Sequence, residues 1–521
     1  MRLILTLIVI VGLVAGPAPS AADNLVEQGR IIYQSGILPD GSQLTAVGAA
    51  GNKVIGQEAA CVGCHRRSGM GSREGSLSVS PITGPILFAR AIPFRPNRPG
   101  RPPQEITPLR QDSRAAYDSA TLVRAIRDGI DSSGRPLIEL MPRYQLDEPF
   151  AASLVAYLQQ LSAAPVPGLE PDKLRLASIV TPDASALRSQ TVVETLTAWA
   201  KGGALGGLPI NLEIWRLEGA ESTWREQLDR FYLRQPPFAI ISGAGGPYWA
   251  PVSDFCERTT IPCLFPIVDL AASDDLDFYS LYFSTGVPLE ARLLSRYLSE
   301  VAQRPGRIVQ LIGNTAGEAA ARQLAASLPN MVVDMRRWRA DAPTQAVTDL
   351  KVDDLLIGWL DPVELQALSN ALPEGLGTQQ MIFSAQLAPP EETALPMTWR
   401  RWVRWVSVRS DPARRYGNAV IGLIPWAKHL RLPLAEEALL ADIYAATYYF
   451  GDALARMRSR WNREYLIETL ETADYKRAVG GAYFSLSLAA GQREAAKVGH
   501  LIGFAEPDYQ RITPIGPRLL P

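Results

Sequence analysis

The spacing of apolar and polar positions changes near residue 165 and divides the chain into two regions. In the first region, apolar residues recur at helical intervals, and this pattern predicts helices at residues 25–35, 119–130 and 148–161. Residues 93–103 contain five prolines and three arginines, which predicts an extended surface loop. Three prolines within residues 163–171 predict a semi-rigid spacer between two domains.

From residue 173 onward, short runs rich in β-branched residues alternate with amphipathic segments of helical length. The predicted strands are residues 174–180, 212–217, 238–242, 307–312, 331–338 and 354–359. The predicted helices between them are residues 190–201, 222–233, 251–259 and 316–328. Such alternation predicts parallel sheets with helices on both faces. A region of about 350 residues exceeds one ordinary open sheet, so we expect two α/β lobes.

The first residues have the layout of a secretory signal. One arginine precedes an apolar run at residues 3–16, and small residues at Ser20 and Ala22 predict cleavage after Ala22. The apolar run is shorter than the ~20 residues that a membrane span requires, and the alternative is an uncleaved N-terminal anchor. No later segment is a continuous apolar run of spanning length. We therefore expect an exported, periplasmic chain whose mature form has no membrane span.

Composition narrows the functions that the chain can have. Lys and Arg number 52 against 53 Asp and Glu, and the net charge of −1 gives no support for nucleic-acid binding. A hydrophobic content of 47% excludes wholesale disorder. Four cysteines in 521 residues cannot form a disulfide scaffold, and three histidines exclude most histidine-rich metal sites.

The attachment pattern of c-type haem is present at Cys61, Cys64 and His65. Two thiols on one helical turn can add to the two vinyl groups of one haem, and the adjacent histidine can bind its iron. A zinc site would need two more nitrogen or sulfur ligands, but the remaining cysteines and histidines lie in the other region. A thioredoxin-type redox pair would lie within a βαβ pattern, which the surrounding sequence does not have. We therefore predict one covalent haem c.

A six-coordinate iron needs a second axial ligand, and methionine is the expected one. Met70 lies five residues after His65, on the same side of the haem plane, so the candidate is Met141. The alternative role for Met141 is that of a core methionine. With both axial positions filled, the iron is suited to one-electron transfer, whereas an enzyme or a gas-binding protein needs an open position.

Residues 25–162 resemble a class I monohaem cytochrome c. The resemblance is carried by Gly29 and Tyr33 in the first helix, the haem motif, residues 125–130, Met141-Pro142-Arg143-Tyr144, and Tyr157-Leu158 in the last helix. It implies an all-α domain whose first and last helices cross near these small and aromatic residues. It also implies that Met141 is the sixth ligand and that the carbonyl of Pro85 bonds the ligand His65. Residues 90–115 are a longer insertion than short cytochromes have.

Seven arginines near the haem motif predict a basic rim that would attract an acidic redox partner, and the alternative is a solvated charged loop. These residues are Arg66, Arg67, Arg73, Arg90, Arg95, Arg98 and Arg101.

Residues 173–510 resemble the type I periplasmic binding proteins, in particular the branched-chain amino-acid and amide receptors. The resemblance is carried by residues 239–243, 260–266 and 309–314, and by the long helical segment 438–454. It implies two α/β lobes that close over a small ligand, with the ligand at strand carboxyl ends and helix N-termini. The candidate cleft residues are Gly245, Tyr248 and Asp269 in the first lobe, and Asn314, Thr315 and Asp361 in the second. Each of them has the alternative role of a turn or helix-cap residue.

Cys256 and Cys263 are seven residues apart, between a predicted helix and the next strand. In an oxidising compartment they are candidates for a disulfide, and the alternative is a pair of buried free thiols.

Together these patterns predict a multidomain chain, in which an all-α cytochrome c domain is followed by a two-lobed α/β domain of the periplasmic-binding-protein type. The expected boundaries are a signal peptide at 1–22, the cytochrome domain at 23–163, a linker at 164–172, the binding-protein-like domain at 173–510 and a tail at 511–521. The expected function is one-electron transfer and not catalysis. The second domain would bind a small molecule or dock a redox partner such as a dehydrogenase. The alternative is a solute receptor whose haem senses redox state or gas.

Overall fold

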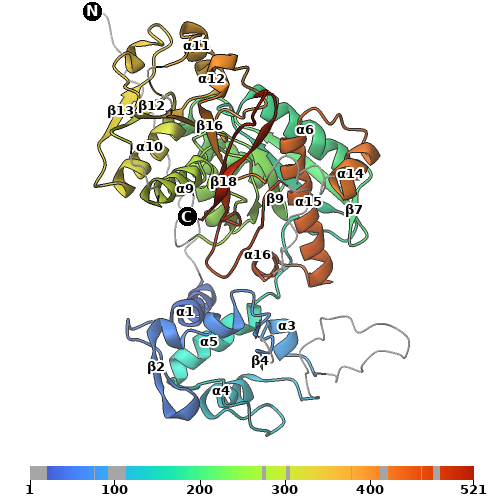
Figure 1. The fold of residues 1–521 in the computed structure, drawn as a ribbon. Helices are drawn as coiled ribbons and strands as arrows, with labels where there is room; N and C mark the ends of the chain where they lie inside the picture. Colours follow the sequence, from blue (N-terminus) through green and yellow to red (C-terminus); the bar gives the residue numbers. More distant parts are fainter. Residues whose placement is uncertain are drawn as a thin grey trace, which may run out of the picture. The chain divides into compact units, whose positions relative to one another are not determined.

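The computed structural model describes residues 20–74, 77–91, 113–272, 277–300, 305–376, 378, 380–410, 420–458, 460–472 and 482–520. The chain forms two compact units, Met1–Ala164 and Pro165–Pro521, which we call unit 1 and unit 2. Unit 1 is blue to cyan in Figure 1, and unit 2 runs from green to red. The apolar run at residues 3–16, the predicted loop at residues 93–103 and most of the insertion at residues 90–115 lie outside the described residues.

Unit 1 combines short helices with two small sheets. The helices are α1 (Ala21–Ser35), α2 (Val62–His65), α3 (Gly84–Leu87), α4 (Ser119–Asp128) and α5 (Glu148–Gln160). Strands β1 (Thr45–Val47), β2 (Lys53–Ile55) and β5 (Arg143–Gln145) form an antiparallel sheet, and β3 (Arg73–Glu74) pairs with β4 (Leu77–Ser78). The prediction of an all-α unit is therefore wrong in this respect. Strands of two or three residues carry no readable alternation and form only by pairing with other segments.

Helices α1 and α5 cross at Gly29, and the contact is too close for any larger residue. A Cβ atom at Gly29 would lie 2.0 Å from the Ser153 carbonyl oxygen and 2.7 Å from the Tyr157 Cβ. The rings of Tyr33 and Tyr157 pack beside this point, with centroids 5.2 Å apart. The predicted crossing of the first and last helices at small and aromatic residues is confirmed. Helix α1 itself begins at Ala21, where Ser20 caps it, so it includes the residues flanking the predicted cleavage point.

The first lobe of unit 2 is a mainly parallel sheet with helices on both faces. Its strands lie in the order β11-β10-β9-β6-β8-β7, and only β7 is antiparallel to its neighbour. They are β6 (Leu174–Val180), β7 (Ala204–Leu205), β8 (Leu208–Arg216), β9 (Ala239–Ala244), β10 (Cys263–Leu264) and β11 (Ser280–Leu281). The helices are α6 (Ala186–Ala200), α7 (Trp224–Arg234), α8 (Ala250–Thr259), α15 (Glu437–Met457) and α16 (Arg463–Glu471). Every residue of the central β9 is buried, as expected for a strand covered on both faces.

The second lobe has a sheet in the order β13-β12-β14-β15-β16-β17-β18. The parallel strands are β12 (Ile308–Ile312), β13 (Val333–Arg337), β14 (Leu355–Trp359), β15 (Gln380–Ser384) and β16 (Val403–Ser407). The helices assigned to it are α9 (Val287–Glu300), α10 (Thr315–Ser327), α11 (Pro362–Ala371) and α12 (Met397–Arg400), and α14 (Leu423–His429) packs on α15. The predicted α/β lobes are thus confirmed.

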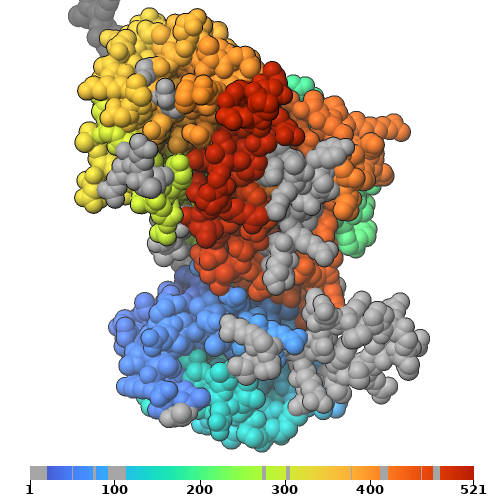
Figure 2. Space-filling model, in the orientation of Figure 1, coloured from blue at the N-terminus to red at the C-terminus, as the bar shows by residue number. Residues whose placement is uncertain are grey.

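The C-terminal residues complete this second sheet. Strands β17 (Gly499–Phe504) and β18 (Ile512–Leu519) extend it as an antiparallel pair. Residues 511–521 are therefore not the tail that the sequence predicts, since β18 is an edge strand of the lobe. Its proline and glycine content hides the strand pattern, but both residue types are tolerated at a sheet edge. Figure 2 shows the C-terminal segment, in red, on the surface of unit 2.

The proline-rich spacer packs onto unit 2 as part of its first lobe. Gly168 has a φ of +83° and lies against the backbone before β9. A Cβ atom at Gly168 would be 2.0 Å from the Phe238 backbone nitrogen. The Gly168 carbonyl also accepts a 2.8 Å hydrogen bond from the Arg175 backbone, and the Pro167 carbonyl accepts one from Arg463. The prediction of a spacer at residues 164–172 is therefore wrong, because tertiary contacts hold this segment in place.

Three neighbouring connections join the two lobes. One follows β11, one follows β16, and the third precedes β17. The Tyr282 backbone bonds Arg493 and Ala495 at 2.8 and 3.0 Å, and the Ser410 nitrogen bonds the Ala482 carbonyl at 3.0 Å. The connections are thus hydrogen-bonded to one another.

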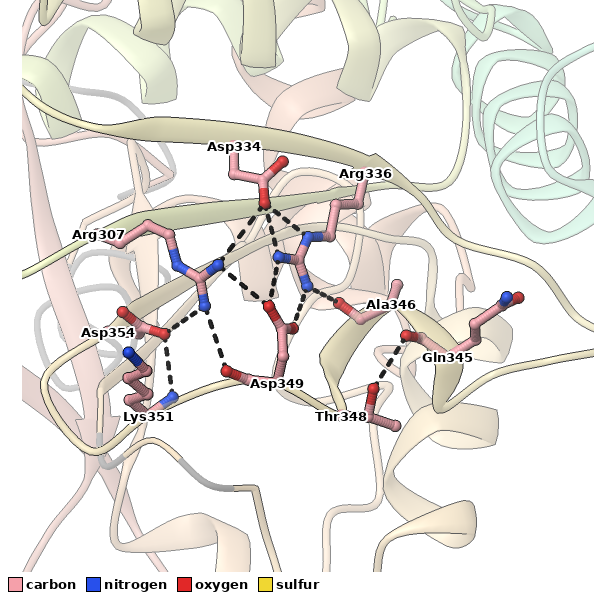
Figure 3. Close-up of polar contacts among 9 residues, drawn as sticks. All are labelled: Arg307, Asp334, Arg336, Gln345, Ala346, Thr348, Asp349, Lys351 and Asp354. Carbon is pink, nitrogen blue, oxygen red and sulfur yellow. Dashed lines mark hydrogen bonds and ion pairs between the residues drawn. The ribbon is translucent and has the colours of Figure 1, made fainter.

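Ion pairs hold the outer strand β13 to the second lobe (Figure 3). Arg336 bonds the carboxylates of Asp334 and Asp349, and Arg307 bonds Asp349 and Asp354 at 3.1 and 2.7 Å. These guanidinium groups hold the pKa values of Asp349 and Asp354 below their usual range. Because the two arginines are already paired, the cluster has a structural role.

Candidate functional site

The haem motif of unit 1 lies on a single helical turn. The His65 backbone nitrogen bonds the Cys61 carbonyl at 2.9 Å, so Cys61, the N-cap of α2, and Cys64 lie three residues apart on one side of the same turn. Both are free thiols. The chain leaves this turn at Arg66, whose carbonyl accepts a 2.6 Å hydrogen bond from the Tyr33 hydroxyl on α1. Helix α1 therefore anchors the motif.

The His65 ring is oriented by a backbone carbonyl. Its Nδ1 lies 3.0 Å from the carbonyl oxygen of Ser80, which can only accept, so Nδ1 carries the proton and Nε2 has a free lone pair. Burial lowers the pKa of His65 to about 4, so the imidazole is neutral at physiological pH. A neutral imidazole with a free Nε2 is the form that binds iron.

Ser80, and not Pro85, supplies this carbonyl. Pro85 lies in the first turn of α3, where its fixed φ suits a helix start. The prediction of Pro85 is therefore wrong. The haem motif does not indicate the length of the loop between His65 and α3. The resemblance therefore pointed to Pro85, which lies five residues after Ser80.

Tyr144 is a residue of this site that the predicted set does not contain. Its hydroxyl lies near the Cys61 thiol, and burial raises the pKa of both groups, that of Cys61 to about 12. Tyr144 lies in β5, three residues after Met141. This contact places the segment that carries Met141 beside the haem motif. Met141 itself is half-buried and packs against the unit 1 core together with Cys61.

These donors fit a covalent haem c. Two free thiols lie on one turn, an imidazole has its Nε2 available, and a thioether lies on a segment in contact with the motif. In the predicted basic rim, Arg73 and Arg90 are exposed and Arg66 and Arg67 are half-buried. Arg95, Arg98 and Arg101 lie outside the described residues.

In unit 2, the predicted cleft residues Tyr248 and Thr315 meet across the two lobes. Tyr248 precedes α8 in the first lobe, and Thr315 begins α10 in the second. Their hydroxyl oxygens are 3.1 Å apart. The strand carboxyl ends of the two lobes therefore face each other at this point.

Gly245 and Asp269 are brought together by Arg188, which the predicted set does not contain. The Arg188 guanidinium donates to the Gly245 carbonyl at 2.5 Å and to the Asp269 carboxylate at 2.7 Å. Arg188 lies on α6, and nothing in its local sequence distinguishes it from a surface arginine. Only the fold brings it to the ends of β9 and β10.

Asn314 and Asp361 act as helix caps. Asn314 accepts from the Gly317 nitrogen at 2.9 Å at the start of α10, and Asp361 accepts from the Glu364 nitrogen at 2.8 Å at the start of α11. Their alternative role as caps is thus the one that the structure shows. Both follow neighbouring parallel strands, β12 and β14, at the same edge of the second sheet.

A second contact between the lobes depends on the buried Glu290 of α9. Glu290 is 1% exposed, and its carboxylate accepts from the Ser384 hydroxyl and, at 3.0 Å, from the Gln386 backbone nitrogen. The Gln386 side chain in turn donates to the Val268 carbonyl of the first lobe at 3.3 Å. Burial raises the pKa of Glu290 to about 8.

The structure has the disulfide between Cys256 and Cys263. It joins the end of α8 to the start of β10, and both residues are buried.

No family model and no curated protein matches the chain. Several solved structures match about two thirds of it. A solute-binding protein of an ABC transporter from Rhodopseudomonas palustris BisB5, in complex with 3,4-dihydroxybenzoic acid, is 9% identical with a TM-score of 0.54 over 66% of this chain and 97% of that one. A branched-chain amino-acid ABC transporter protein from Thermus thermophilus with bound valine is 12% identical with a TM-score of 0.53 over 67% and 97%.

A leucine-binding protein from Thermotoga maritima is 13% identical with a TM-score of 0.50, over 67% of this chain and 99% of that one. At such identities the similarity shows the fold, which is that of the two-lobed type I periplasmic binding proteins. In the described part of the chain, no helix has both the length and the apolar character of a membrane span.

Proposed function

We propose that this chain is an exported solute receptor that carries a covalent haem c on a second unit. The observation that supports the receptor is the meeting of Tyr248 and Thr315 across the lobes. In open α/β sheets, ligands bind at the carboxyl ends of strands, and both residues lie at such ends. The three hydrogen-bonded connections between the lobes supply the hinge for closure. A periplasmic location follows from this role.

Binding tests the receptor directly. Thermal unfolding of the full chain is followed with valine, leucine and 3,4-dihydroxybenzoic acid, and then with further amino acids and aromatic acids. A receptor is stabilised by its ligand, and above the Kd the stabilisation grows with the logarithm of ligand concentration. Unchanged unfolding temperatures with every compound contradict the proposal.

A matched pair of variants locates the binding site. Tyr248→Phe removes the hydroxyl that meets Thr315 and so weakens the closed form, and we expect about tenfold lower affinity for the ligand found above. Tyr509→Phe removes a hydroxyl that bonds Glu506 on the surface and serves as the control. Equal affinities of the two variants would exclude the interlobe site.

The haem would be held by residues of unit 1. Cys61 and Cys64 would form the thioether bonds, and His65 Nε2 and the Met141 sulfur would bind the iron. When bound, the haem supplies a one-electron couple. Ser80 keeps the proton of His65 on Nδ1, and the Tyr144 hydroxyl lies near the Cys61 sulfur.

Expression with haem maturation machinery tests this part. We expect covalent haem in the parent chain, and none after Cys61→Ala with Cys64→Ala, by mass spectrometry and absorption spectra. A parent chain isolated without haem contradicts the proposal. The Cys256→Ala variant with Cys263→Ala controls for general effects of cysteine removal, because it leaves the motif intact.

A second candidate function is one-electron transfer to a partner such as a dehydrogenase. It is favoured by Met141, because an iron with both axial positions filled exchanges electrons without binding gas. The two functions differ in one measurement. A reduction potential that changes when the unit 2 ligand is added supports a receptor that reports through its haem, whereas a constant potential supports a carrier.

A further inference from the structure

Arg143 lies between Met141 and Tyr144 in the sequence, and strand pairing holds its backbone in place. It begins β5, where it pairs with Val47 of β1 in the antiparallel sheet. Two residues upstream, the chain is a loop that runs from the end of α4 to Met141. The orientation of the Met141 side chain therefore depends on how this loop is held.

The guanidinium of Arg143 bonds this loop at two places. One amino group donates to the carbonyl of Met141, and the other donates to the carbonyl of Leu137 at 3.3 Å. The Leu137 nitrogen in turn bonds the Gly129 carbonyl at 2.7 Å. Among the described residues, Arg143 forms no ion pair with a carboxylate. The hydrogen bonds of its guanidinium are made to the carbonyls of Met141 and Leu137 in the loop.

Gly129 leaves the space that the guanidinium fills. It ends α4 in the left-handed conformation, with φ of +68°. A Cβ atom at Gly129 would lie 2.0 Å from the Arg143 Nε and 2.1 Å from its Cζ. The end of α4, the loop and β5 thus meet around one planar cation.

We infer that Arg143 is the positioning residue that holds Met141 for the haem iron, an inference that rests on the proposed haem site. A guanidinium offers several donors in one plane and can bond two carbonyls of one loop at once. A lysine ammonium at the same place has no such planar fork. The next residue, Tyr144, is buried and pairs with Ala46 of β1, so the chain that follows Met141 is also held in place.

The test uses the full chain with haem attached. Arg143→Met and Arg143→Lys are compared with Arg127→Met, which removes an arginine of α4 that bonds Leu146 and Glu148 and does not contact the Met141 loop. The readouts are the sulfur-to-iron charge-transfer band of the oxidised form and the reduction potential. Haem content by mass spectrometry is the internal reference.

We expect both Arg143 variants to keep covalent haem but to show a weaker band and a lower potential, with about a tenfold larger fraction lacking the sulfur ligand. Arg127→Met should match the parent. An undiminished band and an unchanged potential in haem-bearing Arg143→Met overturn the inference.

A second variant covers the case in which Arg143→Met does not fold. Gly129→Ala keeps the charge of Arg143 but displaces its guanidinium, and should weaken the band in the same way. Gly134→Ala is its control, since Gly134 also has positive φ but has open space around it. Equal bands in the two glycine variants also overturn the inference. A parent chain with no haem at all would instead contradict the proposed function, and with it this role of Arg143.

Discussion

His65 and Glu290 are both titratable side chains, and burial shifts their pKa values in opposite directions. The pKa of His65 falls to about 4 and that of Glu290 rises to about 8, because burial disfavours the charged form of each. His65 is thereby kept neutral, with one nitrogen free. Glu290 is poised to change protonation near neutral pH, at a point where α9 meets the segment that reaches the other lobe.

Glu290 makes the stability of unit 2 depend on pH. Its folded pKa of about 8 lies above the ordinary 4.5, so the folded state binds more protons in that window. The stabilisation is therefore full below pH 4.5 and is lost as pH rises through 8. Glu290→Gln removes this dependence. We expect the stability of the variant relative to the parent to rise between pH 5 and pH 9 by on the order of a few kcal/mol.

Chemical denaturation at several pH values measures this difference. Glu300→Gln is the control, because Glu300 is an exposed residue of the same helix and pairs with Arg296. Parallel pH profiles for the parent and Glu290→Gln would contradict the assignment.

At the scale of elements, close approach between two helices determines the shape of unit 1. Helices α1 and α5 are far apart in sequence, yet they cross where Gly29 leaves no space for a side chain. This crossing holds Tyr33 of α1 beside Tyr157 and, through its hydroxyl, the residue after His65. A packing feature thus connects directly to the placement of the haem motif.

Gly29→Ala should force the two helices apart. The added Cβ would meet the Ser153 carbonyl at 2.0 Å, and we expect a loss of about 1–3 kcal/mol in unfolding free energy. Gly48→Ala is a suitable control, since Gly48 has negative φ and its Cβ would meet only an atom at 3.6 Å. A Gly29→Ala protein as stable as Gly48→Ala would show that the crossing is looser than described.

The disulfide between α8 and β10 stabilises the first lobe by restricting the unfolded chain. Cys256 and Cys263 close a loop of eight residues, for which chain entropy gives about 2–3 kcal/mol. Cys256→Ala with Cys263→Ala should lower the unfolding temperature under oxidising conditions. Reductant should destabilise the parent but leave the variant unchanged, and an equal response of both would rule out this role.

At the scale of the whole molecule, the two units have separate hydrophobic cores. The unit 1 cluster is built around Ile32, Tyr33 and Leu154, and none of its members lies beyond residue 161. The clusters of unit 2 begin at Val166. Two cores of this kind need not unfold as one, because cooperativity arises within a packed core.

Calorimetry of the full chain should therefore show two transitions. We expect Gly29→Ala to lower one transition and the double variant of Cys256 and Cys263 to lower the other, because each change touches one core. A single transition, or two that always shift together, would contradict independent unfolding. Ligand added to unit 2 should raise the same transition that the cysteine variant lowers.

Much of the architecture follows from local patterns. The alternation of β-branched runs with helical segments after residue 173 predicts the two α/β lobes, and the cysteine spacing predicts the Cys256–Cys263 pair. Strands that form only by pairing with distant segments cannot be predicted in this way. Strands β1, β2 and β5, and the proline-containing β18, have no periodicity of their own and depend on distant partners. The same holds for the spacer, which contacts with Arg175 and Arg463 hold on unit 2.

The sequence by itself determined the haem motif at Cys61, Cys64 and His65, because its chemistry lies in neighbouring residues. The resemblance to the binding proteins also pointed to Tyr248 and Thr315 as candidate cleft residues. Only the tertiary structure decided that Ser80 orients the histidine, that Tyr144 meets Cys61, and that Arg188 joins Gly245 to Asp269. Local sequence patterns predict contacts between residues that are a few positions apart. These partners are farther apart in the sequence, and only the packing of their segments brings them together.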